Sequence, residues 1–161
     1  MSSSNPSGPP GSVSSDELSA ALLWEALGRH RYSVTGELLF LCTNGPLDED
    51  EIASLLTLLH AQVMAAGAAL LLIDASGGLT MTAAARRYYA EWGRAHGFQP
   101  GSTAVLGASA TTRAILTLVT NGIGMVLRQV PPIRFFKRRS EALTWLHSER
   151  ARWRSLLARP T

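Results

Sequence analysis

A run of six apolar residues, Ala68–Ile73, constrains the fold more than any other part of this sequence. The run is far shorter than a membrane-spanning helix, and no polar residue alternates with the apolar ones. A strand with this composition is buried on both faces, as are the central strands of sheets that carry helices. The sequence therefore predicts a soluble α/β domain built around this strand.

The segments on either side alternate between strand and helix signals. Short strands are expected at residues 31–34 and 38–42, joined by a turn at Gly36, and again at 103–106 and 133–136. Helices are expected from Pro46 or Asp48 to Gly67, from Thr80 or Thr82 to His96, from Thr111 or Thr112 up to an interruption at Asn121-Gly122, and from Ser140 onward. This order predicts a mixed, mostly parallel sheet of about five strands with an N-terminal hairpin and about four helices.

The N-terminal region differs from the rest in composition. Residues 1–15 are mostly Ser, Pro, Gly and Asn, which predicts a disordered tail. Residues 16–28 contain Leu18, Leu22 and Leu27 at helical spacing, which predicts a helical appendage, and residues 29–161 are expected to form one domain. The start lacks the basic and apolar regions of a signal peptide, so we expect a cytoplasmic protein without a transmembrane segment.

No catalytic, metal or cofactor motif is recognisable. The four histidines show no metal-ligand spacing and are expected at the surface, and the single cysteine, Cys42, is expected in the core. The net charge is +3, and the basic residues are scattered except near the C-terminus, which argues against nucleic-acid binding. We therefore expect a protein that is not an enzyme and needs no cofactor.

Three local features, in order along residues 30–153, resemble the STAS domain family and especially its SpoIIAA-like branch of anti-sigma factor antagonists. They are the hairpin at Thr35–Leu38, the buried strand that ends in Asp74-Ala75-Ser76, and the segment Ile133–Phe136 followed by Ser140–Leu146. The last segment resembles the closing strand of that branch and its helix with an Ala-Leu-x-Trp-Leu run. The first two features occur in many α/β proteins.

The resemblance implies a bacterial regulatory module that binds a protein partner, such as an anti-sigma kinase, and is switched by phosphorylation at the start of one helix. The Asp-Ser-Ser-Gly pattern of the family is absent, and Leu79–Ala84 occupies its place. The nearby hydroxyls, Ser76, Thr80 and Thr82, are the candidate switch residues. The expected partner or ligand surface combines the segment from Asp74 through Gly77 and Gly78 with exposed side chains of the following helix, namely Arg86, Arg87 and Tyr89.

Other interpretations of the same residues stay open. Thr80 or Thr82 can serve only as a helix N-cap, and Asp74 only as a cap for the backbone of the following loop. A pocket near Asp74 and Gly107 would instead indicate a small-ligand or lipid-binding module of STAS/SEC14-like fold. An enzyme that uses Asp74 with Ser76 or Ser109 is the third hypothesis.

Overall fold

The computed structural model describes residues 22–97, 99–127 and 131–158, and a six-stranded sheet runs through them. The sheet confirms the predicted mixed, mostly parallel architecture, because only the second strand runs antiparallel to its neighbours. Its strands follow one another in chain order: β1 (Glu25–Leu27), β2 (His30–Thr35), β3 (Leu38–Leu47), β4 (Ala69–Met81), β5 (Gly101–Leu106) and β6 (Ile133–Phe136).

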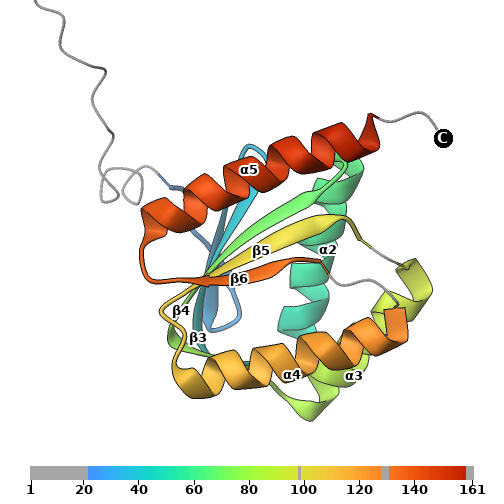
Figure 1. The fold of residues 1–161 in the computed structure, drawn as a ribbon. Helices are drawn as coiled ribbons and strands as arrows, with labels where there is room; N and C mark the ends of the chain where they lie inside the picture. The colour runs from blue at the N-terminus through green and yellow to red at the C-terminus, as the bar shows by residue number, and fades with distance from the viewer. Residues whose placement is uncertain (1–21, 98, 128–130, 159–161) are drawn as a thin grey trace, which may run out of the picture.

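The four described helices divide unequally between the two faces of this sheet. They are α2 (Glu49–Ala66), α3 (Ala83–His96), α4 (Ala110–Leu127) and α5 (Arg139–Leu157). Crossovers between parallel strands have one preferred hand, so a strand order that advances steadily from β3 to β6 places the three connecting helices on one face. Figure 1 shows this arrangement, with α5 alone on the opposite face.

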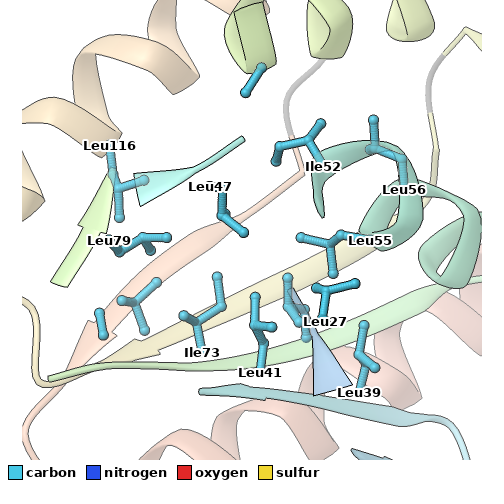
Figure 2. Packing of buried hydrophobic residues seen from close by; sticks show 14 residues of the cluster. Leu27, Leu39, Leu41, Leu47, Ile52, Leu55, Leu56, Ile73, Leu79 and Leu116 are labelled. Atoms are coloured by element: carbon cyan, nitrogen blue, oxygen red, sulfur yellow. The ribbon is translucent and has the colours of Figure 1, made fainter. Parts of the chain in front are cut away.

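The larger core lies between the sheet and α2, α3 and α4. Leu39 and Leu41 of β3 are almost completely buried there, and Figure 2 shows them pointing toward Leu55 of α2. Alternation along the strands supplies these inward positions. The other labelled members of this cluster are Leu27, Leu47, Ile52, Leu56, Ile73, Leu79 and Leu116.

The smaller core lies under α5. Phe40, Leu70 and Leu72 point to this face because they alternate with the residues of the larger core. Ala142, Leu146 and Trp153 of α5 pack against them. The central strands are therefore buried on both faces, as the apolar run predicts.

A buried polar cluster attaches α5 to the sheet. Ser102 of β5 donates a hydrogen bond to Glu149 Oε2 at 2.7 Å and accepts one from Trp153 Nε1 at 3.0 Å. Arg152 Nη1 lies 3.0 Å from the same carboxylate oxygen. A single hydroxyl on the sheet thus holds two side chains of the helix.

The helix predicted at residues 16–28 is wrong for the part that the structure describes. Residues 25–27 form β1, which pairs with β2 so that Glu25 lies opposite Tyr32. As a strand, this segment gains backbone hydrogen bonds from β2 and sends Leu27 into the larger core and Leu22 into the smaller one. A short apolar segment does not distinguish helix from strand by periodicity. Residues 16–21 and the predicted tail at 1–15 lie outside the described residues.

The loop predicted after Asp74 is also wrong, since β4 continues to Met81 and β3 continues beside it to Leu47. The pairing shifts register near Asn44, which makes an irregular bulge. At Gly77 an added Cβ would overlap the backbone carbonyl of Thr43. Gly77 therefore serves close strand packing, whereas Gly78 adopts a positive φ of 91° in the irregular part of the strand.

Two details of α4 differ from the prediction. The helix begins at Ala110, where Ser109 Oγ accepts a hydrogen bond from the backbone N–H of Thr112, and it runs through the expected interruption at Asn121-Gly122. Glycine and asparagine lower helix propensity without forbidding the conformation. Leu118 of this helix faces outward and is 71% exposed.

We expect Ser102→Ala to lower the free energy of unfolding by about 2 kcal/mol, because it leaves a buried carboxylate and an indole N–H without their shared partner. Urea denaturation followed by circular dichroism measures this change. Ser155→Ala, at an exposed position of α5, is the matched control and should leave the midpoint unchanged. Equal midpoints for both variants would contradict the anchoring role of Ser102.

Candidate functional site

Asp74 lies within β4, where it is paired with Cys42 of β3 and Leu106 of β5. Its Oδ1 atom accepts hydrogen bonds from Ser76 N at 3.0 Å and from Ser76 Oγ at 2.5 Å. The carboxylate therefore caps nearby backbone, one of its two expected roles. Ser76 is exposed, and an added Cβ at Gly107 would lie 3.0 Å from it.

Thr82 is the N-cap of α3. Its side chain accepts a hydrogen bond from Ala85 N at 3.1 Å, which satisfies one of the free N–H groups of the first turn. The capping role expected of Thr80 or Thr82 is thus confirmed for Thr82, whereas Thr80 lies in β4. Arg86 and Arg87 are exposed one turn into the helix, and Arg86 Nη1 donates to Met81 O at 2.6 Å.

The structure separates these two groups of candidate residues. Ser76 and Thr82 are six positions apart along an extended strand, a distance of up to about 20 Å. Gly77 and Gly78 lie between them in the strand and not in a loop before the helix. The single surface expected from the sequence is therefore two regions: the Asp74 region (Asp74, Ser76 and Gly107) and the Thr82 region (Thr82, Arg86 and Arg87).

Tyr89 belongs to neither region. It is partly buried and packs against the larger core, and burial raises the pKa of its phenol. The expectation of an exposed contact residue is wrong here, because this position of α3 faces α2 and the sheet. Tyr89 instead lines a small apolar cavity of about 100 Å³, which also involves Leu56, Leu71 and Trp92.

A larger and more polar cavity, the Asp74 cavity, opens beside Asp74 on the α5 face of the sheet. Its volume is about 260 Å³. Arg31, Cys42, Asp74 and Leu106 occupy paired positions on β2, β3, β4 and β5, so their side chains emerge in one row. The cavity is lined by Trp24, Arg31, Phe40, Leu41, Cys42, Leu72, Asp74, Leu106 and Arg139.

Three charged side chains near Cys42 act on its thiol. Burial raises the pKa of the Cys42 thiol, and the Asp74 carboxylate raises it further, while Arg31 and Arg139 act in the opposite direction. Cys42 is only partly buried, so its assignment to the core is wrong in this respect. A thiol with a raised pKa is a poor nucleophile at neutral pH, which argues against covalent chemistry at this cysteine.

A second polar cluster ties the start of α2 to the β1–β2 turn. Glu51 accepts hydrogen bonds from Arg29 N and Asp48 N, and His30 Nε2 lies 3.1 Å from its Oε2 atom. His30 Nδ1 accepts a hydrogen bond from Asn44 N at 2.9 Å, so Nε2 carries the proton of a neutral imidazole. The expectation of surface histidines is wrong for His30, which is 1% exposed.

Burial of Glu51 would by itself raise the pKa of its carboxyl. The backbone N–H groups of Asp48 and Arg29, together with His30, outweigh this effect and hold the pKa below its ordinary value. Glu51 also forms a capping box with Asp48 at the start of α2. The Glu51 carboxylate therefore has a structural role: it links the start of α2 to the β1–β2 turn.

Among the residues that the structure describes, no three His, Cys, Asp or Glu side chains are grouped so that they could hold a metal ion. In the same part of the chain, no helix is long and apolar enough to cross a lipid bilayer.

A sequence profile described as SpoIIAA-like matches residues 38–147. The chain belongs to the SpoIIAA-like family. The match begins at β3 and ends within α5, so it includes both the Asp74 region and the Thr82 region.

Two solved structures are similar to this chain at low sequence identity. An uncharacterized protein of the DUF3478 family from Shewanella loihica is 20% identical, with a TM-score of 0.47, and the alignment covers 71% of this chain and 89% of that one. The anti-sigma factor antagonist SpoIIAA, in its unphosphorylated form, is 16% identical, with a TM-score of 0.45 and coverage of 79% and 98%. No curated protein matches the sequence significantly.

The sequence does not indicate that several of the residues near Asp74 line one cavity. Arg31 and Cys42 lie in predicted strands, but their approach to Asp74 depends on strand register. Trp24 and Arg139 come from opposite ends of the chain, and no local pattern brings them together. The usable signal is the alternation in β3, which places Phe40 and Cys42 on the same face.

We expect Glu51→Gln to lower the free energy of unfolding at neutral pH by roughly 2 kcal/mol, because an amide N–H₂ replaces an acceptor of buried hydrogen bonds. The folded-state pKa is depressed, so the contribution of the ionised carboxylate is fully present above the ordinary glutamate pKa of about 4.3 and is lost as the pH falls toward the folded value. Denaturation of both proteins between pH 7 and pH 3 should show a gap that narrows in acid. A gap independent of pH would contradict the role of the charge.

Thr82→Ala should destabilise the protein by about 1 kcal/mol, because the first turn of α3 loses its cap. Thr82→Asn should stay close to wild type, since asparagine caps at least as well as threonine. Guanidinium denaturation of the two variants separates the capping effect from any effect on binding. Equal loss in both would show that the threonine methyl group, and not the cap, matters.

Proposed function

We propose that this protein is a regulatory module that binds a protein partner without catalysing a reaction, in the manner of anti-sigma factor antagonists. The observation that carries this proposal is the SpoIIAA-like match, which spans the central strand and the exposed start of α3. An anti-sigma kinase is the kind of partner that the resemblance suggests.

The Thr82 region is the proposed partner surface. Arg86 already contacts the end of β4 through its guanidinium, while Arg87 extends from the next position of the helix and is exposed. Together they give the start of α3 a positive surface that suits an acidic partner. The N-terminal end of the helix dipole adds to this positive potential.

Thr82 is the best of the three candidate switch residues on physical grounds. A phosphate on Thr82 would add about −1.5 to −2 charge at a helix N-terminus, where negative charge is stabilised, and near two arginines. A phosphate on Ser76 would replace the hydrogen that Ser76 donates to Asp74 and would lie against that carboxylate. Thr80 is partly buried in β4 and is less accessible than Thr82.

Thr82→Asp and Thr82→Asn make a matched pair for testing the switch. Both side chains cap a helix well, but only aspartate adds a negative charge. Tagged wild type and both variants are used to capture partners from a lysate of the native host, and mass spectrometry covers Ser76, Thr80 and Thr82. We expect wild type and Thr82→Asn to retain the same partner and Thr82→Asp to release it.

Two further outcomes would overturn parts of this proposal. Retention of the partner by all three proteins would exclude a charge switch at Thr82. If Arg87→Glu also left capture unchanged, the Thr82 region would not be the contact surface.

A second candidate function, small-ligand binding, has its own support in the Asp74 cavity. The cavity is about 260 Å³ and opens on the α5 face of the sheet, midway along β3 and β4 and beside the last residue of β5. Its lining includes Leu106 and not the neighbouring Gly107, so it differs slightly from the pocket that the sequence suggests. The cavity near Tyr89, at about 100 Å³, is too small to support lipid binding.

A further inference from the structure

The segment of residues 44–48 is held at both ends by one buried pair of side chains, His30 and Glu51. At the first residue of the segment, Asn44 N donates a hydrogen bond to His30 Nδ1 at 2.9 Å. At the last residue, Asp48 N donates to Glu51 Oε2 at 2.9 Å, and the same oxygen lies 3.1 Å from His30 Nε2. We call residues 44–48 the clamped segment.

The clamped segment also holds the backbone of the Thr82 region. Leu47 O accepts a hydrogen bond from Thr82 N at 3.0 Å, at the point where β4 ends and α3 begins. The pairing of β2 with β3 stops at Cys42, so beyond it the N–H of Asn44 is met by the ring of His30 and not by a strand. What holds this segment therefore also positions the N-cap of α3.

Only a neutral imidazole fits this arrangement. Nδ1 of His30 accepts a hydrogen bond while Nε2 donates one, so the ring carries a single proton. A second proton, on Nδ1, would face the N–H of Asn44, and two donors cannot share a hydrogen bond. Asn44 is an exposed residue, so its N–H can turn to water once it leaves the ring. Protonation of His30 therefore opens one end of the clamped segment.

The charged groups around the ring make this protonation attainable. Glu51 of α2 presents its carboxylate to Nε2 of His30, and an adjacent negative charge favours the imidazolium form. Arg29 of the β1–β2 turn acts in the opposite direction, with its Nε atom 3.9 Å from the other carboxylate oxygen. The paired residues 44–47 of β3 and 77–81 of β4 include no titratable side chain. Four further acidic or phenolic groups lie on β1, β2 and the start of α2: Glu25, which binds Tyr32, Asp48, which binds the backbone of Glu51, and the exposed Glu49 and Asp50.

We infer that His30 is a pH-sensitive latch on the clamped segment and thereby controls the Thr82 region. The neutral ring holds Asn44 and keeps the start of α3 in place, whereas protonation releases Asn44 and loosens the clamped segment together with Thr82. This inference rests on the proposed function, in which the Thr82 region is the partner surface, and adds its regulation. The partner binds the neutral form and is released in acid.

The latch is tested first on the free, full-length protein, labelled with nitrogen-15, between about pH 8 and pH 5. This range spans the ordinary titration of histidine, whereas Glu51 stays ionised because its neighbours hold the pKa of its carboxyl below the ordinary value. We expect the Nδ1 resonance of His30 to report protonation as the pH falls, and the amides of Asn44 and Thr82 to shift with the same midpoint. Hydrogen-exchange protection of these two amides should fall about tenfold in the acid form.

His30→Gln is the principal variant, because a glutamine amide can donate to Glu51 and accept from Asn44 but does not titrate. His147→Gln is the matched control, since His147 is exposed on α5. We expect the pH response of Asn44 and Thr82 to vanish in His30→Gln and to persist in His147→Gln. Circular dichroism confirms that each variant is folded, and the wild-type titration decides the proposal if His30→Gln does not fold.

Capture of the partner at two pH values links the latch to function. Tagged wild type and both variants are exposed to a lysate of the native host at about pH 7.5 and at about pH 5.5. We expect wild type and His147→Gln to retain about fivefold less partner at the lower pH, and His30→Gln to retain equal amounts at both.

The outcomes separate the latch from the proposed function. A His30 ring that stays neutral throughout the range, or one that titrates while the amide of Asn44 is unchanged, would overturn the latch, and so would the same response in His30→Gln. A response that does not reach Thr82, or equal capture by wild type at both pH values, would overturn its control of the Thr82 region. Capture of no partner at either pH would instead overturn the proposed function, and the titration of the free protein would still decide the latch.

Discussion

In the part of the chain that the structure describes, a single helix packs on one face of the sheet, and the rest of the structure depends on this arrangement. The steady strand order from β3 to β6 commits α2, α3 and α4 to the same side, so α5 is the one described helix that packs on the opposite apolar surface. Ser102, Glu149 and Trp153 hold it over one part of that surface. Among the described residues, the Asp74 cavity lies on this face beside α5, so its position follows from the order of the strands.

The length of β4 separates two groups of candidate residues that the sequence alone would combine. A strand that ended at Asp74 would bring Ser76 and Thr82 into one loop. Because β3 and β4 continue together, the Asp74 region faces the α5 side while the Thr82 region lies at the start of α3. The surface proposed for a protein partner and the cavity proposed for a small ligand therefore share no residue.

The sequence predicts those features that depend on neighbours along the chain. The hairpin at Gly36, the capping box of Asp48 with Glu51 and the capping of α3 by Thr82 all follow from local spacing. The burial of His30 and the row that joins Arg31, Cys42 and Asp74 depend on which residues of separate strands lie opposite each other. Gly77 misleads for the same reason, since a glycine needed for close packing between strands has the same local signature as a glycine in a turn.

The contact between Gly28 and Glu51 restricts how related sequences can vary. Gly28 has a φ of +58°, and any Cβ there would overlap the Glu51 carboxyl group. That carboxyl group also holds Arg29, His30 and Asp48, so a shorter side chain at position 51 would release three partners at once. The two positions are therefore coupled: chains that keep glutamate at 51 should keep glycine at 28, and chains that lose one should lose the other and the tight β1–β2 turn with it.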